Sequence, residues 1–456
     1  MSRISLPNEL WLGIFAHIWS KAGPDGILRA LLTITSVNVH WRRLAIADPR
    51  LWTEIYVPSP SPKHQIYRTS SAQIERVKAF LERSMTAPLT LWLYRIAFPP
   101  SLSTTEIAEA ESEWKALFRL LEPHMNRCGN LVIFHLAQNS SPLVPELFHL
   151  LQAPTFPILR HFWFVDTRQF ADQNAIQRPW NIDYRKSPLR KLYFSDMTGY
   201  LPQSLDVAWP NLHTLDLSHV PQSRWPEVCK TLAKLPCLLD LKIQLEIQVR
   251  SDASPGPLLY LSQSRVILPR LSTITTNYLP AWMDICTPAL SRIEFNSLGV
   301  YRPSLESSSE AELLKALAEL RTTVREVEFR DSLVQARPML PILRKLDNVE
   351  VLTFHGCHSL HTVISEIVTT RKTTGALPSS ENLANVRNDS PSGLSCTPAL
   401  PPRIEFLPLL RIVSFSGQLT VPESAKFYTL LEDLRSSFPV LDVRWEVTGV
   451  RTNLFF

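Results

Sequence analysis

The residues Leu6-Pro7-Asn8-Glu9-Leu10, followed by Ile14-Phe15, begin the stretch of this chain that says most about its fold. A proline suits the first turn of a helix, and the carboxylate of Glu9 is favourable near the positive end of the helix dipole. Leu10, Ile14 and Ile18 then recur at helical spacing, which gives a wide apolar stripe. The sequence therefore predicts that an amphipathic helix begins here.

Two more helices are expected in the next thirty or so residues. Gly23-Pro24-Asp25-Gly26 should break the first helix, and a second helical stretch should follow from Ile27. Val37, Trp41 and Leu44 recur at i, i+4 and i+7 until Asp48-Pro49 stops the pattern. A unit of about 50 residues buries a poor fraction of its surface alone, so its excess apolar side chains must meet something else.

Taken together, these motifs resemble the F-box, the helical module by which F-box proteins attach to the Skp adaptor of cullin-based ubiquitin ligases. The Leu-Pro-x-Glu opening, the Ile-Phe pair, the Val-x-x-x-Trp-Arg-x-Leu core and the Pro-x-Leu-Trp ending stand in this order within residues 4–57. The alternative is a three-helix core that has no partner.

The resemblance implies a set of residues that contact the adaptor, and through it the cullin. They are Leu6, Pro7, Glu9, Leu10, Ile14, Phe15, Val37, Trp41, Leu44 and Trp52. A buried tryptophan in so small a module serves its own core as readily as an interface, so both roles stay open for the two tryptophans. The Leu6-Pro7 corner is the clearer candidate for adaptor contact.

Composition limits what the rest of the chain can be. The chain has 456 residues, of which 45% are hydrophobic and 20% charged, as in ordinary soluble globular proteins. The net charge of +5 is mild, and no block of basic residues indicates a nucleic-acid partner. Apolar stretches are short and interrupted, so we expect no membrane span, and the first residues do not resemble a signal peptide.

The cysteines favour a reducing, cytoplasmic or nuclear location. Six of them are scattered along the chain without a C-x-x-C pair, so neither a disulfide framework nor a zinc ribbon is expected. His355-Gly356-Cys357-His358, with His361 nearby, contains residue types that ligate zinc. No second ligand group of suitable spacing accompanies it, and a polar turn between a strand and a helix is the alternative. We expect no metal and no other cofactor.

A degenerate repeat of the form Pro-x-Leu-x-x-Leu-x-Leu occupies much of the remaining chain. The clearest copies are Pro157 to Phe164, Pro188 to Phe194, Pro210 to Leu217 and Pro236 to Ile243, with further copies from Leu271, Leu290, Val324, Val349 and Leu410 and weaker ones from Leu131 and Val440. The last apolar positions of each copy alternate, which predicts a short strand with one buried face.

Helical stretches are expected between these strands. They are Trp225 to Leu235, Glu310 to Leu320, Pro338 to Leu346, His361 to Thr370 and Glu423 to Phe438. Strand and helix repeated in units too small to bury their own apolar faces predict a solenoid. Residues 129–447 resemble irregular leucine-rich repeat domains, which are commonly found behind an F-box. The expected fold class is α/β, with a three-helix F-box followed by an irregular leucine-rich-repeat-like solenoid of short parallel strands and helices.

We therefore divide the chain into an F-box at residues 1–57, a linker with bridging helices at 58–128, and a repeat-like domain at 129–456. The linker opens with a stiff spacer at Pro58 to Pro62 and should contain helices at Ser71 to Met85 and Thr105 to Met125, with the strand-like Leu89 to Ile96 between them. Residues 371–403 are rich in Thr, Ser, Asn, Gly and Pro, which predicts a flexible insert.

In leucine-rich repeats, the strand positions that alternate with the buried ones face the concave side. Here these positions include Trp163, Tyr193, Asp216, Lys242, Glu294, Glu328 and Arg444. Aromatic anchors in a polar surround are typical of protein-binding surfaces, so we expect these residues to bind a target protein. The alternative is that they are merely the solvated face that any strand must have.

No catalytic motif competes with this interpretation. The 12 glycines form neither a P-loop nor a G-x-G-x-x-G turn, and there is no G-x-S-x-G elbow. We expect a non-catalytic substrate receptor, in which the F-box docks the adaptor and the repeats hold an unidentified target protein for ubiquitination. The alternative is an interaction scaffold from which no ubiquitin transfer follows.

Overall fold

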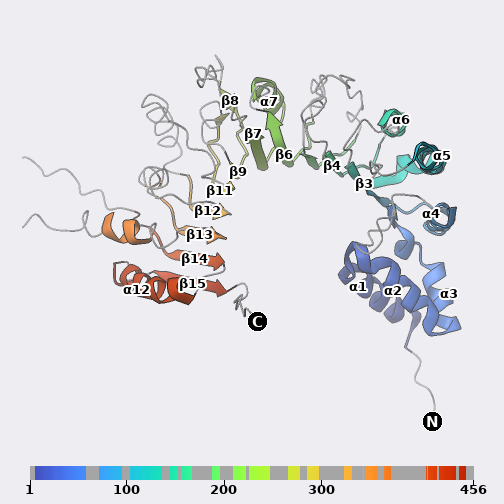
Figure 1. Cartoon of the computed structure of the whole chain (residues 1–456), viewed down its shortest axis with the longest axis horizontal. Helices are drawn as coiled ribbons and strands as arrows, with labels where there is room; N and C mark the ends of the chain where they lie inside the picture. The colour runs from blue at the N-terminus through green and yellow to red at the C-terminus, as the bar shows by residue number, and fades with distance from the viewer. Residues whose placement is uncertain are drawn as a thin grey trace, which may run out of the picture. The chain divides into compact units, whose positions relative to one another are not determined.

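The computed structural model of this chain divides into two compact units, Met1–Leu258 and Leu259–Phe456, which are described separately below. It describes residues 6–57, 71–94, 103–135, 144–152, 156–166, 187–195, 209–221, 225–246, 265–277, 285–296, 323–330, 343, 346, 348–356, 364–370, 407, 409–417, 421–437 and 441–447. The chain is mixed α/β with extensive parallel strand pairing and a helical N-terminal region, as the sequence predicts (Figure 1).

Three helices and a short 3-10 helix open the first unit. They are α1 (Asn8–Lys21), α2 (Gly23–Val37), α3 (Val39–Ala47) and η1 (Pro49–Trp52). The first helix begins directly after Pro7, as expected. The break comes at Ala22, one residue before the predicted Gly-Pro-Asp-Gly segment, because a proline is accommodated in the first turn of the second helix.

The predicted helical run through Val37, Trp41 and Leu44 is wrong as a single helix. Asn38 is extended, and its side chain accepts a hydrogen bond of 2.8 Å from the backbone N–H of Trp41. It therefore ends α2 and caps α3, a role that asparagine fills well because its side-chain oxygen satisfies a free N–H of the first turn. Val37 is the last residue of α2, whereas the other two residues lie on α3.

Seven strands of the first unit pair in parallel and in the order of the sequence. They are β1 (Glu54–Val57), β2 (Leu89–Tyr94), β3 (Cys128–His135), β4 (His161–Asp166), β5 (Lys191–Ser195), β6 (Thr214–Pro221) and β7 (Asp240–Glu246). The helices α4 (Ser71–Arg83), α5 (Thr104–Leu121), α6 (Val144–Gln152) and α7 (Trp225–Leu232) lie on one side of these strands (Figure 1). The opposite side of the strands is thus left without a covering helix in the described part of this unit.

The second unit repeats this arrangement. Its strands β9 (Thr273–Thr276), β11 (Arg292–Asn296), β12 (Glu326–Arg330), β13 (Val351–His355), β14 (Ile412–Gly417) and β15 (Asp442–Val447) are parallel neighbours in this order. The short strands β8 (Val266–Ile267) and β10 (Ile285–Cys286) form a separate pair, and α12 spans Val421–Ser437. Four buried phenylalanines from β11, β12, β13 and β14 stack in register, with ring centroids 5.1 to 5.5 Å apart.

A turn with proline in its second position explains the Pro-x-Leu element of the repeat. In each turn the N–H of the fourth residue donates to the carbonyl of the first, as for Leu159 to Phe156, Leu212 to Trp209, Leu238 to Leu235, Leu271 to Leu268, Leu290 to Thr287 and Leu410 to Leu407. The fixed φ of proline suits the second position of such a turn. Each of these leucines is buried, so the turn directs an apolar anchor into the core just before the strand begins.

Every repeat copy that the sequence predicts coincides with a strand, and the helices expected at residues 71, 105, 225 and 423 are present as α4, α5, α7 and α12. Residues 364–370 are also helical, as expected. The helix predicted at 310–320, most of the one at 338–346, the spacer at 58–62 and the insert at 371–403 lie outside the described residues. The strands β1 and β2 extend the parallel ladder ahead of residue 129, where the predicted repeat domain begins.

Candidate functional site

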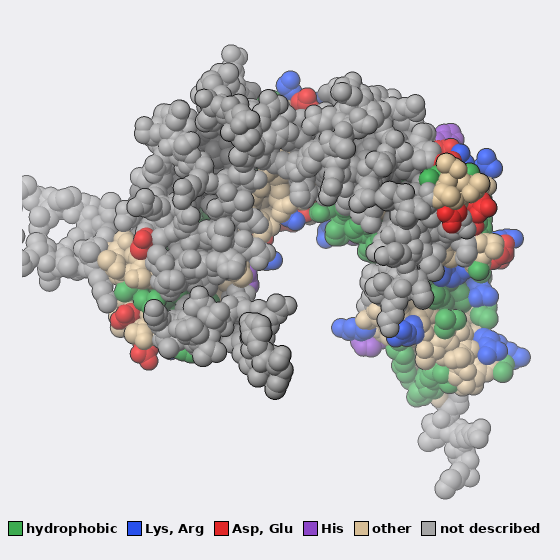
Figure 2. Space-filling model, viewed as in Figure 1, with side chains coloured by type: hydrophobic (Ala, Val, Ile, Leu, Met, Phe, Trp, Pro, Cys, Tyr) green, Lys and Arg blue, Asp and Glu red, His purple; other side chains and the backbone are tan. Residues whose placement is uncertain are grey.

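Four apolar side chains form an exposed strip, three on the first helix and one, Leu6, two residues before it. This apolar strip consists of Leu6, Leu10, Ile14 and Ile18, whose exposed fractions are 38%, 54%, 39% and 39%. The last three recur every fourth residue of α1, so they lie on one face of the helix. Figure 2 shows hydrophobic side chains on the visible surface of these N-terminal helices.

The other face of the first helix is aromatic and packs inward. The ring of Trp41 lies 4.5 Å from the ring of Trp11 and 5.1 Å from that of Phe15, between centroids. Phe15 has no exposed surface, so it lies in the core of the module and not at the surface, where a contact with an adaptor was predicted. Trp41 is half-buried in the same cluster.

Trp52 also belongs to the core. Its indole N–H donates to the carbonyl of Ala45 at 2.8 Å, and its ring meets that of Phe80 edge-on at 5.1 Å. The guanidinium of Arg83 lies 4.3 Å from the centroid of the same ring. Because Trp52 joins η1 to α4 in this way, the structure favours the core role over the interface role that the sequence left open.

The remaining predicted adaptor residues are accessible. Pro7, Glu9 and Val37 are exposed, and Leu44 is half-buried. Leu32, Val39 and Ile46 are further exposed apolar side chains on α2 and α3 that the sequence interpretation did not single out. Their signal was available, since apolar residues outside the buried stripe of a short helix indicate surface that another protein covers.

The predicted target-binding residues of the first unit fall on one cross-strand row. Trp163 is paired with Tyr193, Tyr193 with Asp216, and Asp216 with Lys242. The row continues toward the N-terminus through Val132 and Trp92 to Tyr56. We call these seven positions the outward row of the first unit; six of them alternate with the buried positions of their strands, whereas Val132 is itself buried.

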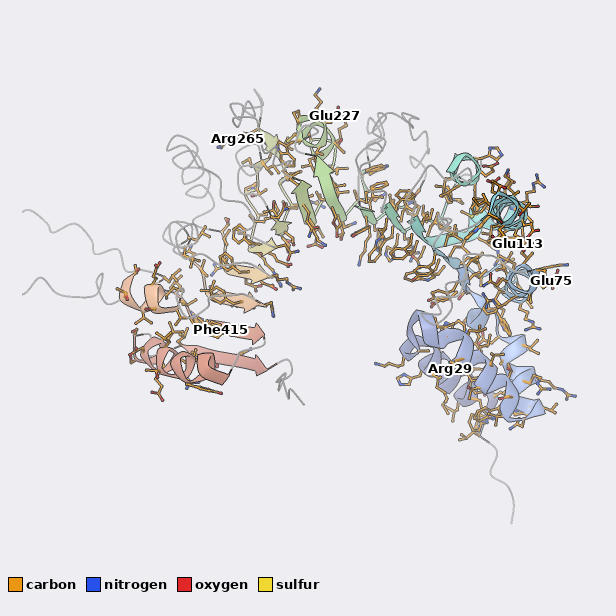
Figure 3. The ribbon with its side chains drawn as sticks, viewed as in Figure 1. Arg29, Glu75, Glu113, Glu227, Arg265 and Phe415 are labelled. Carbon is orange, nitrogen blue, oxygen red and sulfur yellow. The ribbon has the colours of Figure 1, made fainter. Side chains whose placement is uncertain are left out.

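Aromatic rings dominate the N-terminal part of this face. Tyr56, Trp92, Tyr94, Phe134, Trp163 and Tyr193 form an unbroken series of ring contacts with centroid separations of 4.5 to 6.3 Å, and we call this series the aromatic track. Figure 3 shows side chains projecting from these strands on the side away from α5 and α6. The sequence interpretation named only the last two rings. The alternation Leu91, Trp92, Leu93, Tyr94 could have added the second strand to the row.

The C-terminal part of the row is polar and internally paired. The ammonium group of Lys242 lies 3.1 Å from a carboxylate oxygen of Asp216 and 6.0 Å from the ring centroid of Tyr193. Burial raises the pKa of Asp216, while Lys242 and the hydroxyl of Ser218, which donates at 3.0 Å, act in the opposite direction. Asp216 is thus engaged by its neighbours and is not a free anchor.

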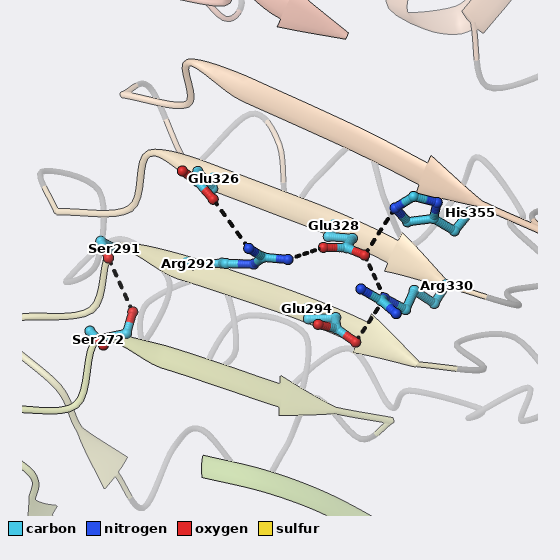
Figure 4. A network of polar contacts seen from close by, with 8 residues as sticks. All are labelled: Ser272, Ser291, Arg292, Glu294, Glu326, Glu328, Arg330 and His355. Carbon is cyan, nitrogen blue, oxygen red and sulfur yellow. Dashed lines mark hydrogen bonds and ion pairs between the residues drawn. The ribbon is translucent and has the colours of Figure 1, made fainter. Parts of the chain in front are cut away.

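In the second unit the outward row is ionic at its centre. Glu294 and Glu328 are direct cross-strand neighbours. The row continues from Glu328 through Thr353 on β13 and Ser414 on β14 to Arg444 on β15. The carboxylate of Glu328 is contacted by Arg292, Arg330 and His355, and that of Glu294 by Arg330 at 3.0 Å (Figure 4). We call these five side chains the glutamate cluster.

Glu328 does not have the exposed position that the sequence predicts. Its side chain is 5% exposed, because two guanidinium groups and an imidazole close over it. Burial of a carboxylate is tolerated only when it is paired in this way. Arg444 is exposed, and its Nε donates to a carboxylate oxygen of Asp442 at 2.8 Å.

Other chemistry is limited in the described part of the chain. No group of three or more His, Cys, Asp and Glu residues is arranged there to hold a metal, and Cys357, His358 and His361 of the predicted turn lie outside it. None of the described cysteines forms a disulfide bond, and burial raises the pKa of the Cys128 thiol to about 12, so it stays protonated and unreactive. Among the described helices, none has both the length and the apolar character to cross a bilayer.

Comparison with known proteins gives no relative for this chain. A scan against protein-family models finds no match, and a search of the curated proteins finds none either. The two family resemblances therefore rest on the residues quoted above, and the functions that they imply are proposals.

Proposed function

We propose that this chain is the non-catalytic substrate-recognition subunit of an SCF-type ubiquitin ligase. Its N-terminal helices act as an F-box that docks the Skp adaptor, and its strands and helices act as an irregular leucine-rich-repeat solenoid that holds a target protein. The apolar strip supports this proposal most strongly, because three large apolar side chains on the helix that resembles the adaptor-binding helix of an F-box, together with Leu6 before it, are exposed. Such helix faces are typical docking surfaces.

The adaptor-binding residues under this proposal are the accessible members of the predicted set. They are Leu6, Pro7, Glu9, Leu10, Ile14, Val37, Leu44 and the half-buried Trp41. Phe15 and Trp52 hold the helices in place from inside the module. The binding energy should come from the apolar strip, while Glu9 contributes little at an exposed position.

The mechanism is proximity. A receptor that holds the adaptor with one surface and the target with another raises the concentration of target lysines near the ubiquitin-loaded enzyme, and it makes or breaks no bond itself. The outward rows are the surfaces available for the target. The proposal places the protein in the cytoplasm or the nucleus, where such ligases work.

Affinity capture of the full chain tests the proposal. The adaptor and the cullin should co-purify with the wild-type chain, and both should be lost when Leu10 and Ile14 are changed to glutamate. Target proteins should accumulate in cells that carry the chain without residues 1–57. Capture of the adaptor with no accumulating protein would instead indicate the scaffold function, and absence of the adaptor would contradict the receptor function and leave only a scaffold.

A further inference from the structure

The aromatic track is more than a set of separate exposed rings. It runs from Tyr56 on β1 to Tyr193 on β5, and each ring lies within 6.3 Å of the next, between centroids. Strands are about 4.8 Å apart, so five strands give a track of about 19 Å. An extended peptide advances about 3.3 Å per residue, and about six residues would therefore span the track.

The orientation of the rings determines what the track can bind. Tyr56 with Trp92, on β1 and β2, and Tyr94 with Phe134, on β2 and β3, form two stacked cross-strand pairs whose planes are inclined by 17° and 5°. Trp92 and Tyr94, two residues apart on β2, connect the pairs with nearly parallel planes. Side chains stand upright on a sheet, and the rings therefore present their edges to solvent. Ring edges carry partial positive charge, in contrast to the negative faces. The uncovered surface of this part of the track is apolar and slightly electropositive.

Basic side chains reinforce this potential at the β4 and β5 end. His161 and Lys191 are register partners and lie two residues before Trp163 and Tyr193, on the same face of the strands. Arg160 and Arg190 directly precede the two strands, and all four side chains are exposed. Burial lowers the pKa of His161, and Lys191, Arg160 and Arg190 lower it further.

The carboxylates beside the track are already engaged. The hydroxyl of Tyr56 donates to Glu54 at 2.8 Å at one end, and Lys242 pairs with Asp216 beyond the other. A neutral hydroxyl does not balance a carboxylate, so the attraction for anions is confined to the β4 and β5 end, where Lys191, Arg160 and Arg190 are exposed. Figure 2 shows hydrophobic side chains next to those of Lys and Arg around β4.

We propose that the aromatic track binds an extended peptide segment in which acidic residues alternate with apolar ones. Its acidic side chains meet Lys191, Arg160 and Arg190, and its apolar side chains pack on the ring edges. The inference rests on the proposed function in one respect, because it takes this segment to belong to the protein delivered for ubiquitination.

A single-stranded nucleic acid fits this surface less well. Bases bind to proteins by stacking on open ring faces, and the faces from Tyr56 to Phe134 are covered by neighbouring rings. Of the rings in the track, only Trp163 and Tyr193 depart from this arrangement, and their planes are inclined by 44° to each other. Trp163 has 40% of its surface exposed. Two rings and a few cations offer little to a polynucleotide, whereas an acidic peptide uses the whole track.

Selection from a random 12-residue phage-displayed peptide library against the full chain tests the inference. Enriched peptides should combine Asp or Glu with apolar residues. Fluorescence anisotropy with an enriched peptide should give about tenfold weaker binding for Trp163→Ala and about fivefold weaker binding for Lys191→Glu, since each removes one anchor of a small interface. Tyr428→Ala and Lys230→Glu remove an exposed ring and an exposed cation elsewhere, the ring being 61% exposed against 40% for Trp163, and both should leave the affinity within about twofold.

Several results would overturn the inference. In the selection, these are a failure to enrich any peptide and the enrichment of neutral or basic peptides. In the anisotropy measurements, they are equal effects of the track variants and their controls, and displacement of the peptide by a 12-nucleotide single strand at a lower concentration than by unlabelled peptide. Adaptor binding is measured on the same variants and should not change. A chain that binds the acidic peptide but not the adaptor would contradict the proposed function alone.

Discussion

The outward rows of the two units differ in chemistry although the same backbone repeat forms them. In the first unit the row carries stacked aromatic rings beside exposed basic residues, whereas in the second unit the glutamate cluster balances its own charges. The inward positions are alike, because leucine, isoleucine, valine and phenylalanine fill both cores. The comparison shows that the inward row fixes the fold, and that the outward row is free to specify what each unit binds.

Loss of an inward ring should have the largest effect on stability. Phe354 lies in the middle of the phenylalanine stack of the second unit and is fully buried. Phe354→Ala should lower the free energy of unfolding by about 3 to 5 kcal/mol, because it leaves a cavity in a packed core. Chemical denaturation measures this, with Thr353→Ala on the outward row as the control. A loss below about 1 kcal/mol would show that the stack contributes little packing.

The glutamate cluster gives the next largest effect. Glu328→Gln should destabilise the second unit by about 1 to 3 kcal/mol, because Arg292 and Arg330 lose the buried charge that balances them. Glu326→Gln is the matched control, since its side chain is 48% exposed and its pair with Arg292 is 3.6 Å long. Exposed pairs contribute little, so this control should change stability by about 0.5 kcal/mol or less. Equal effects would mean that burial of Glu328 is unimportant.

The outward ring of Trp163 should matter much less to stability than to binding. Trp163→Ala removes the close cross-strand pair with Tyr193 and the longer contact with Phe134, and should cost about 1 kcal/mol or less in thermal or chemical unfolding. Phe164→Ala, at the adjacent buried position, should cost about 3 to 5 kcal/mol. If both variants lost the same stability, the distinction between inward and outward rows would fail in the first unit.

The smallest effect concerns pH. Burial lowers the pKa of His124 and His161 in the folded chain, with a contribution from nearby cations in both cases. The unfolded chain then binds protons first as the pH falls, so stability should decrease below about pH 6.5. His161→Gln and His124→Gln should each flatten the change in melting temperature between pH 7.5 and 5.5. A wild-type chain that is more stable at pH 5.5 than at pH 7.5 would contradict this prediction.

Much of the fold could be predicted from the sequence because the buried positions are strongly periodic. Leucines such as Leu212 and Leu238 follow a proline turn and precede a strand, and this local signal needs no knowledge of distant residues. The cap at Asn38 was missed because the apolar spacing continues across it. The burial of Glu328 could not be predicted, since it depends on partners from β11 and β13 that only the strand register brings together.

The candidate surfaces show the same limit. Leu10 and Ile14 were correctly expected on an amphipathic helix, but only packing against Trp41 shows that Phe15 faces the core while they remain exposed. Of the rings in the aromatic track, the sequence interpretation named only Trp163 and Tyr193. Tyr56 and Trp92 were missed because they precede the recognisable repeats. Cross-strand stacking is set by the pairing of β1 with β2, which the sequence does not state.

The affinity of the full chain for a purified Skp adaptor, measured by calorimetry for three proteins, tests the central proposal most directly. The wild-type chain should bind, Ile14→Glu should weaken binding at least about a hundredfold, and Ile267→Glu should match the wild type. The control is apt because Ile267 is 65% exposed on β8 and far from the first helix in sequence. Equal affinities for the two variants, or no binding by the wild type, would contradict the account.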